Sequence, residues 1–415
     1  LANKNTQYDN KQKKMKGLFY NSIRRIHSMD LRELEESFGK TFFSEKKPRC
    51  YRAPGRVNLI GEHIDYNGGH VFPCALSVGN YAAVTDREDK EIRFYSENFP
   101  ESGILSCSLN SIQYKKEDSW SNYAKGVIKA FLDHGFEIPH GFDIYVKGNI
   151  PGSGLSSSAA LEVLIATILN DTFSFGVSKT DIALFSQEAE NKFCGRNCGI
   201  MDQFASANGK KNRALFLDCA TLKFDYVPLN LKGYKIIVTN SNKPHSLVTS
   251  HYNDRRKECE RALSDLQKVV SIQNLCELSK EEFQKYEYSI KDPICKRRAR
   301  FAVEEEERTK KAVQALKKDD LVLFGQLINA SGDGLKNDYD ATCKEIDILV
   351  EEARKQEGCL GSRETGGGWG GNTISIVQED KVALFRKNVE DAYFEKTGLH
   401  ADFNPLDVGD GGKRL

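Results

Sequence analysis

The stretch PGSGLSSSAALEV, residues 151–163, joins two glycines and three consecutive serines to a segment that favours helix. The first backbone N–H groups of a helix have no partner within it, and the helix dipole is positive there, so such a loop can bind an anion. Glycines let the anion approach, and serine hydroxyls can add donors or Mg²⁺ ligands. No lysine follows the glycines, which excludes the common lysine-containing phosphate loop. A plain turn with a serine cap is the alternative.

A second cluster, APGRVNLIGEHIDYNGG at 53–69, places short polar side chains among glycines. Carboxylates accept hydrogen bonds from sugar hydroxyls, and an arginine can hold a phosphate with two parallel N–H groups. Apolar residues within the segment anchor it in a core, which argues against a solvated turn. The cluster therefore predicts a site for a hydroxyl-rich ligand, with the candidate residues Arg56, Glu62, His63, Asp65 and Asn67.

Asp202 lies in GIMDQ, residues 199–203, between Met201 and Phe204. Partial burial is expected at this position. A carboxylate in apolar surroundings is expected either to pair with a charged or hydrogen-bonding group or to have a functional role. Asp202 is therefore a candidate functional residue.

A third glycine cluster, GGGWGG at 366–371, formally satisfies the G-x-G-x-x-G pattern of dinucleotide-binding proteins. The expected context is absent, because the preceding SRET is a poor strand and the following NTISIV reads as a strand instead of a helix. Dinucleotide binding is therefore disfavoured.

The elements that must position these residues follow from apolar periodicity. Helices are expected at 28–40, 120–134, 159–169, 178–193, 302–316, 321–330, 343–355 and 381–397. Strands are expected at 49–60, 71–86, 91–96, 141–146, 214–218, 222–227, 235–239 and 372–377. A change to a helix-dominated pattern places a domain boundary near residue 230. The alternation of strands and helices indicates an α+β or α/β class.

Composition limits the partners. Lysine and arginine total 60 and aspartate and glutamate 59, which argues against a nucleic-acid surface. The basic KRRAR at 296–300 is interpreted as a solvated helix start. Eleven irregularly spaced cysteines are typical of reduced thiols in a cytoplasmic protein, and metal binding by Cys194 and Cys198 is disfavoured. No apolar run is long enough to span a membrane, and the polar residues 1–25 are expected to form a mobile tail.

Together these motifs, in this order, resemble the GHMP kinase superfamily and, closely within it, the galactokinase family, from about residue 49 to 378. The resemblance implies a two-domain α+β GHMP kinase fold with the active site in the cleft between the domains. Residues 26–230 would form an N-terminal domain of the ribosomal-protein-S5 domain 2 type, and residues 231–415 a ferredoxin-like α/β domain. The implied reaction is ATP- and Mg²⁺-dependent phosphorylation of galactose at its anomeric hydroxyl, the first committed step of the Leloir pathway, by a monomer.

The resemblance also implies roles for individual residues. Asp202 matches the catalytic aspartate and Arg56 the arginine that stabilises the transferring charge. The implied sugar contacts are Arg56, Glu62, His63, Ile64, Asp65, Gly199, Asp202 and Tyr252. The implied ATP contacts are Gly152, Ser153, Gly154, Leu155, Ser156, Ser157 and Ser158 in the phosphate loop, with Ser96, Trp120 and Tyr123 beside the adenine. Ser158 and Glu190 match the Mg²⁺ ligands.

Elementary chemistry agrees with these roles. A hydroxyl nucleophile needs a nearby base or fixed negative charge, which Asp202 supplies. Arg56 and Mg²⁺ would provide the positive charge that the lysine-free loop lacks. Three residues near the third glycine motif depart from the family pattern, namely Glu364, Trp369 and Asn372, and they bear on sugar selectivity.

Two other functions stay open. One is a sibling sugar-1-kinase acting on N-acetylgalactosamine, arabinose or galacturonate. Glu62 and His63 are as expected for the galactose 6-hydroxyl, which favours galactose. The other is a non-catalytic galactose and ATP sensor, against which the intact phosphate loop, Arg56, Glu190 and Asp202 argue.

Overall fold

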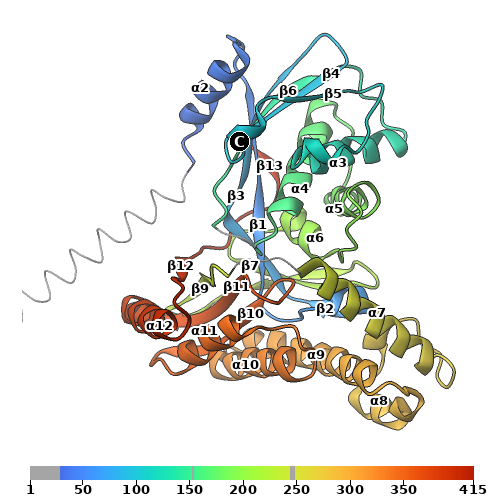
Figure 1. The fold of residues 1–415 in the computed structure, drawn as a ribbon, viewed down its shortest axis with the longest axis vertical. Helices are drawn as coiled ribbons and strands as arrows, with labels where there is room; N and C mark the ends of the chain where they lie inside the picture. The colour runs from blue at the N-terminus through green and yellow to red at the C-terminus, as the bar shows by residue number, and fades with distance from the viewer. Residues whose placement is uncertain (1–28, 152–153, 244–247) are drawn as a thin grey trace, which may run out of the picture.

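The upper unit in Figure 1 is built on a six-stranded sheet with helices on both faces. The computed structural model describes residues 29–151, 154–243 and 248–415. The strand order is β13-β1-β3-β6-β4-β5, antiparallel except for the β4–β6 pair. The strands are β1 (Arg49–Asn58), β3 (Pro73–Asp86), β4 (Glu91–Ser96), β5 (Leu105–Ser108), β6 (Phe142–Gly148) and β13 (Lys413–Arg414).

The alternation of side chains along these strands separates two hydrophobic layers. On one face Cys50, Tyr81 and Tyr145 pack against α2. On the other face their neighbours Tyr51 and Ala82 join a large core with the helices that follow β5. The helices of this unit are α2 (Leu31–Phe42), α3 (Ser121–Asp133), α4 (Ser157–Thr172), α5 (Lys179–Glu188) and α6 (Met201–Asn208). The sheet is therefore buried on both faces and gives the site a rigid support.

The lower unit is a four-stranded antiparallel sheet with helices packed below it (Figure 1). Its strand order is β10-β11-β9-β12, formed by β9 (Tyr234–Asn240), β10 (Cys359–Thr365), β11 (Asn372–Gln378) and β12 (Asp402–Pro405). Its helices are α9 (Pro293–Lys317), α10 (Leu321–Asn337), α11 (Lys344–Arg354) and α12 (Val382–Thr397). Helices α7 (Val248–Leu266) and α8 (Lys280–Tyr286) extend to one side of both units.

A small sheet lies between the two units. It consists of β2 (His70–Val71), β7 (Arg213–Asp218) and β8 (Phe224–Pro228). A continuous hydrophobic cluster also crosses the seam, because Val57 of β1 packs in one core with Val238 of β9 and Ile374 of β11. The two units thus share buried surface directly beside the end of β1.

Residues 406–414, which we name the C-terminal strap, run back from the lower unit to the upper one. The N–H of Gly411 donates to the carbonyl of Gly209 at 2.8 Å, and the N–H of Gly412 donates to that of Ser206 at 2.9 Å. A Cβ atom on Gly411 would overlap the carbonyl of Ala207, so this approach requires glycine. The strap ends in β13, which pairs with Tyr51 and Arg52 of β1.

Most predicted elements are confirmed, including the hairpin of β7 and β8. The dismissal of SRET as a strand is wrong, because residues 359–365 form β10 and pair with β11. Its polar side chains are buried: Arg363 is fully buried and Glu364 is 2% exposed. The glycine cluster at 366–371 is therefore a turn between antiparallel strands, not a dinucleotide-binding loop. The division at residue 230 remains a prediction, and the predicted tail at 1–25 lies outside the described residues.

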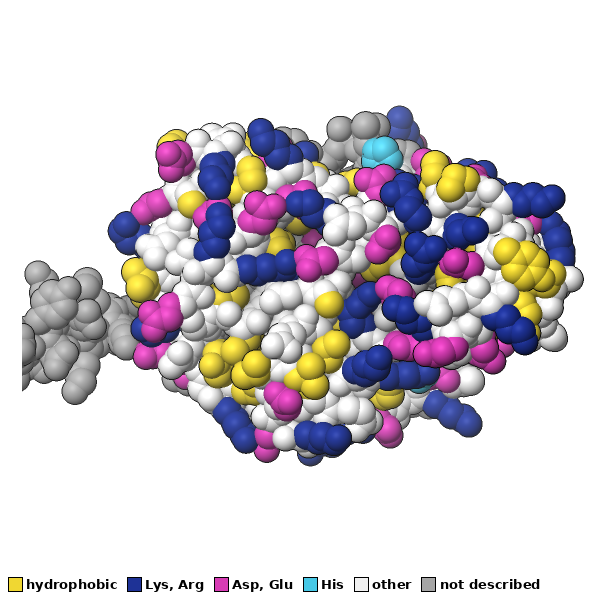
Figure 2. Space-filling model, turned by 90° about the horizontal axis from the view of Figure 1, so that it is seen from below, with side chains coloured by type: hydrophobic (Ala, Val, Ile, Leu, Met, Phe, Trp, Pro, Cys, Tyr) yellow, Lys and Arg dark blue, Asp and Glu magenta, His cyan; other side chains and the backbone are white. Residues whose placement is uncertain are grey.

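Charged side chains of both signs are interspersed on the face of the molecule shown in Figure 2. The interpretation of 296–300 as a solvated helix start is wrong for one residue, because Arg298 is 2% exposed. Its Nε donates to Glu258 at 2.9 Å. Within the part of the chain that is described, no helix is long and apolar enough to cross a membrane.

Candidate active site

Arg56 and Asp202 form a two-pronged ion pair at the seam between the units. Arg56 follows an irregularity in the register of β1, and Asp202 lies in the first turn of α6. Nε of Arg56 donates to Oδ1 of Asp202 at 2.7 Å, and Nη2 donates to Oδ2 at 2.8 Å. The Arg56 side chain is 5% exposed and that of Asp202 is 29% exposed. The carboxylate is thus fixed in one orientation and remains open to a ligand.

Three hydrogen bonds join the phosphate loop to this pair. Nη1 of Arg56 donates to the carbonyl of Gly154 at 3.0 Å, and its backbone N–H donates to the carbonyl of Leu155 at 3.1 Å. Oγ of Ser156 donates to Oδ2 of Asp202 at 2.5 Å. The φ angle of Ser156, +60°, turns the chain into α4. Loop, arginine and aspartate are therefore one hydrogen-bonded assembly.

The rest of the phosphate loop is partly visible. Ser157 and Ser158 begin α4, where the first backbone N–H groups have no helical partner. Gly152 and Ser153, both predicted phosphate contacts, lie outside the described residues.

The third glycine motif packs directly against the phosphate loop. A Cβ atom on Gly154 would lie 2.9 Å from Nδ2 of Asn372, and one on Gly366 would lie 3.1 Å from the Gly154 carbonyl. The φ angles are +88° at Gly154 and +100° at Gly366, which only glycine adopts freely. The two units therefore meet through backbone at the phosphate loop.

The predicted magnesium ligands lie side by side. Oγ of Ser158 donates to Oε1 of Glu190 at 3.3 Å, and Glu190 lies in the π-helical turn at 189–193. The Gln203 amide donates to the carboxyl groups of Glu190 at 2.7 Å and Glu162 at 3.0 Å. Burial raises the pKa of Glu190, and the Asp202 charge adds to the shift. Burial, together with Glu190, holds the pKa of Glu162 well above its usual range.

The predicted sugar ligand Glu62 is deeply buried and already engaged. It is 1% exposed, and its Oε1 accepts hydrogen bonds from Oγ1 of Thr365 at 3.0 Å and from the N–H of Gly366 at 2.8 Å. Oε2 accepts from Nδ2 of Asn58 at 3.0 Å. A carboxylate oxygen has two acceptor positions. Oε2 therefore has capacity for one further donor.

His63 presents one ring nitrogen without a partner. Its φ angle is +61°, an uncommon conformation for histidine. Nδ1 lies 2.8 Å from Oη of Tyr66, while the buried Nε2 has no hydrogen-bond partner among the described residues. Burial lowers the pKa of His63 to about 3, with Arg255 and Arg363 adding to the shift and the Gly367 backbone opposing it. The ring is therefore neutral and has one free polar atom.

Asp65, Gly199 and Tyr252 lie close to one another and to the Arg56–Asp202 pair. A Cβ atom on Gly199 would overlap the Asp65 carboxylate, so the close approach requires glycine. The Tyr252 ring lies 5.4 Å from that of His63. Burial holds the pKa of Tyr252 well above its usual range, and the charges of Asp65 and Asp202 contribute. These three predicted sugar contacts therefore lie close together in the structure. Ile64 differs, because its side chain is fully buried in the core.

The predicted adenine residues lie at the end of β4 and at the start of α3. Burial raises the pKa of Tyr123, with the Arg196 charge opposing and the Glu190 charge adding to the shift, so Tyr123 lies near Glu190. Trp120 is 6% exposed and its ring packs 6.4 Å from those of Phe94 and Phe99. Its buried indole N–H has no partner within 29–151, 154–243 and 248–415. Ser96 ends β4 and is buried.

Sequence reasoning missed several residues that shape the site. Glu162 was detectable as an acidic residue in the apolar run AALEVLIATIL. Thr365, which holds Glu62, belongs to the strand that the pattern did not predict. Trp369 was noticed only as a departure from a family pattern. Its backbone N–H donates to the carbonyl of Ala341 at 2.7 Å, and its ring lies 6.0 Å from that of His63.

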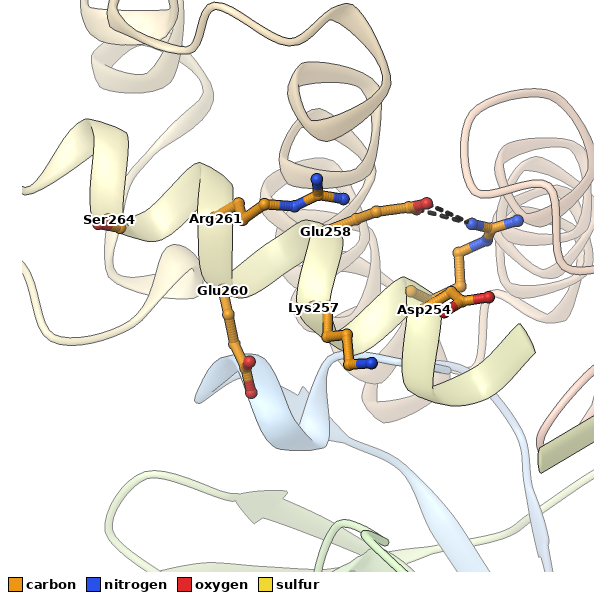
Figure 3. A pocket seen from close by; sticks show the side chains of 7 residues that line it. Asp254, Lys257, Glu258, Glu260, Arg261 and Ser264 are labelled. Carbon is orange, nitrogen blue, oxygen red and sulfur yellow. Dashed lines mark hydrogen bonds and ion pairs between the residues drawn. The ribbon is translucent and has the colours of Figure 1, made fainter. Parts of the chain in front are cut away.

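A surface hollow of about 620 Å³ lies along the outer side of α7 (Figure 3). Among its lining residues, Arg255 pairs with Glu258 at 2.7 Å. It contains none of the predicted site residues and is not the candidate active site. The hollow is lined by Asp254, Arg255, Lys257, Glu258, Glu260, Arg261 and Ser264.

Asp65 gives the ligand-free protein a pH-dependent stability. Burial raises its pKa to about 7, and the Asp202 charge adds to the shift. An unfolded chain loses this proton near pH 4, so the folded state binds the proton more tightly and its stability falls as pH rises from about 4 to 7. We expect Asp65→Asn to raise Tm above wild type at pH 8 and to match wild type at about pH 4.5. Thermal unfolding across this range is the measurement, and equal pH slopes for the two proteins would contradict the assignment.

Three family profiles match the chain. The galactokinase galactose-binding signature matches residues 36–86, the GHMP kinases N-terminal domain matches 122–210, and the GHMP kinases C-terminal domain matches 312–396. The first profile covers the polar cluster around His63, and the second covers the phosphate loop and Asp202.

Similar proteins cover nearly the whole chain. A galactokinase from Clostridium beijerinckii is 51% identical over 92% of this chain and 98% of its own length. One from Bacillus subtilis is 48% identical, with the same two coverages. The crystal structure of Lactococcus lactis galactokinase complexed with galactose superposes with a TM-score of 0.91 at 44% identity, covering 93% of this chain and 100% of that one. Methanococcus jannaschii mevalonate kinase, with a TM-score of 0.63 and 20% identity over 88% and 100% of the two chains, shares the fold.

Proposed function

The chain belongs to the galactokinase family of GHMP kinases, and we propose that it transfers a phosphoryl group from ATP to the anomeric hydroxyl of D-galactose, giving α-D-galactose 1-phosphate and ADP. It is an enzyme with the two-domain GHMP kinase fold. The observation that carries the residue-level proposal is the Arg56–Asp202 fork, which is hydrogen-bonded to the phosphate loop.

Asp202 is proposed to act on the sugar hydroxyl. Its two oxygens already accept from Arg56 and Ser156, which fixes the carboxylate plane. The one remaining acceptor position, on Oδ1, can take a hydrogen bond from the hydroxyl and receive its proton as the new P–O bond forms. The fixed negative charge also favours loss of that proton. Because Arg56 already holds the Asp202 carboxylate in position, the carboxylate does not have to reorient during the reaction.

Arg56 is proposed to stabilise the charge on the transferring group. Its guanidinium touches both the catalytic carboxylate and the Gly154 carbonyl, so it lies between the base and the phosphate loop. Electrostatic stabilisation of the transferring phosphoryl oxygens usually contributes more than any other effect to the rate of such reactions. A lysine in the loop is then unnecessary.

Magnesium is proposed to bind at Ser158 and Glu190. Mg²⁺ prefers oxygen ligands and often uses only one or two protein groups beside substrate phosphates and waters. The Ser158 hydroxyl and the Glu190 carboxylate, 3.3 Å apart, fit this preference, and the carboxyl group of Glu162 accepts from the same Gln203 amide as Glu190. When bound with ATP, the ion would offset the negative charge of the phosphates. The described residues contain no group of three or more His, Cys, Asp or Glu suited to a metal.

Galactose selectivity is proposed to depend on Glu62, His63 and Asp65. The free Nε2 of His63 and the open position on Oε2 of Glu62 offer hydrogen bonds in a buried setting. A site that binds a hydroxyl in this way rejects analogues lacking it by factors of about 10⁴. A sibling sugar kinase and a non-catalytic sensor are not favoured.

The test is phosphorylation of a sugar panel by the purified protein with ATP. We expect ADP release with galactose to exceed that with N-acetylgalactosamine, arabinose or galacturonate, to require Mg²⁺, and to give an acid-labile sugar phosphate. A clear preference for another sugar, or an acid-stable product, would overturn the proposal. We further propose a cytoplasmic location, supported by eleven cysteines that are all unpaired in the structure. We also propose a monomer, which size-exclusion chromatography tests.

A further inference from the structure

Four of the predicted sugar contacts lie in residues 61–70, which we name the sugar loop. The two ends of this loop lie side by side. Just outside it, the N–H of Leu59 donates to the carbonyl of Phe72 at 3.1 Å. A Cβ atom on Gly61, at one end, would lie 2.7 Å from the carbonyl oxygen of His70, at the other end. The sugar loop therefore projects from a narrow neck of backbone.

Two consecutive glutamates of α9 bind the backbone on the two sides of this neck. The N–H of Gly61 donates to Oε1 of Glu305 at 3.0 Å, and the N–H of His70 donates to Oε2 of Glu306 at 2.6 Å. Nδ1 of His70 also lies 2.7 Å from Oε1 of Glu306. Consecutive side chains of a helix point about 100° apart. One turn of α9 thus reaches both ends of the sugar loop.

Both carboxyl groups are buried and have further partners. Glu305 is fully buried, and Glu306 is 3% exposed. Oε1 of Glu305 also accepts from Oγ of Ser331 at 2.6 Å, and its Oε2 accepts from Arg308. Lys310 pairs with Glu306 at 2.6 Å. Burial of a carboxylate costs free energy unless it is paired and hydrogen-bonded. An apolar side chain would avoid this cost, but it could not accept the backbone N–H groups of the sugar loop.

The sugar loop contains backbone conformations that need such support. The φ angle is +96° at Gly61 and +61° at His63. The second value is uncommon for a residue with a side chain. A conformation of this kind persists only where the surrounding structure restrains the backbone. The hydrogen bonds from Gly61 and His70 to α9 supply that restraint at the two ends of the loop.

We propose that Glu305 and Glu306 are positioning residues for sugar binding, which hold the two ends of the sugar loop from α9 so that its polar side chains meet the sugar in a fixed arrangement. This inference rests on the proposed function. The Glu62 carboxylate is held separately, by Thr365 and Gly366. A loop that is ordered before the sugar arrives spares the sugar the cost of ordering it.

The first test is Glu305→Gln. The substitution keeps the size of the side chain, but one of its two oxygens becomes an NH₂ group, so Gly61, Ser331 and Arg308 can no longer all donate to it. We expect the Kd for galactose, measured by calorimetry without ATP, to rise about tenfold, the scale of one hydrogen bond to a charged group. The KM for ATP at saturating galactose should change less than about twofold.

Ser331→Ala is a milder variant that stays informative if Glu305→Gln does not fold. It leaves Glu305 in place and removes one donor that orients its carboxylate. The galactose Kd should rise about threefold, again with little change in the KM for ATP. Amide hydrogen exchange gives a readout that does not depend on affinity. Without sugar, residues 61–70 should exchange faster in both variants than in wild type, and galactose should restore their protection.

Glu352→Gln is the matched control. Glu352 is also buried, at 7% exposed, and lies in a helix, α11, where it accepts from Lys355 at 2.7 Å and from Lys396 at 2.5 Å. The variant loses a buried carboxylate outside the site. Its Tm should fall, while its galactose Kd and the exchange of residues 61–70 should stay at the wild-type values.

Three results would overturn the inference. The first is a wild-type galactose Kd in both Glu305→Gln and Ser331→Ala. The second is a Glu305→Gln protein that loses affinity for galactose and ATP to the same degree, which would indicate general disruption. The third is exchange of residues 61–70 that is no faster than in Glu352→Gln. Failure of the proposed function differs from all three, because it would appear as wild-type protein that does not phosphorylate galactose.

Discussion

Asp202→Asn should lower kcat for galactose at least about 100-fold, the scale of losing a general base. An amide cannot take up the hydroxyl proton, and its NH₂ group would face donors that now point at carboxylate oxygens. Arg56 would also remain buried without its counter-charge. Sugar affinity should change less than about fivefold, because Glu62, His63 and Asp65 still bind the ring hydroxyls. Steady-state kinetics and calorimetric Kd values separate the two effects.

Asp143→Asn is the matched control for this variant. Asp143 accepts an arginine fork with the same geometry, from Nε and Nη2 of Arg93 at 2.7 Å each, but lies in β6 outside the site. Its kcat should stay within about twofold of wild type. A near-normal kcat for Asp202→Asn, with this control behaving as expected, would remove the role assigned to Asp202.

Arg56→Lys should lower kcat about 100- to 1,000-fold, the loss seen when one preorganised charge donor is removed. The substitution keeps the positive charge but not the planar fork. A lysine cannot bond both oxygens of Asp202 and the Gly154 carbonyl together, as the guanidinium does. Asp202 and the phosphate loop would then no longer be held together by hydrogen bonds to one side chain. The measurement is kcat and the KM for ATP at saturating galactose.

Arg93→Lys provides the comparison for Arg56→Lys. It breaks an equivalent fork in the upper sheet, so both variants lose a two-pronged ion pair. Thermal unfolding should show similar destabilisation for the two proteins, whereas only Arg56→Lys should lose activity. Equal activity in both variants would mean that Arg56 has no part in the reaction.

The sequence allowed prediction of those parts of the site whose residues lie within one short segment. Glycine and serine run into a helix at the phosphate loop, and Arg56 and Asp202 stand in short segments with recognisable neighbours. The helices and strands around them follow from apolar periodicity, as the alternation along β4 and its burial illustrate. Local pattern was enough because each feature is fixed within a few residues.

Prediction from the sequence failed where the burial of a polar side chain depends on residues far away in the sequence. Residues 362–365 look too polar for a strand, yet Arg363 donates to the carbonyls of Asn58 and Leu59 across the seam. Glu162 sits in an apolar helix because Gln203 meets it from another helix. The hydrogen bond between Tyr66 and Tyr339 joins residues 273 positions apart. The pattern of apolar residues within one segment cannot reveal contacts with residues in another segment.

The C-terminal strap has a consequence for how the protein is made. Because β13 completes the edge of the upper sheet beside β1, that sheet cannot be finished until residue 414 has left the ribosome. The strap also holds the end of α6, the helix that carries Asp202. A nascent chain should therefore need residues 406–414 before its candidate active site is fully supported, and the upper unit expressed without them should lack one edge strand.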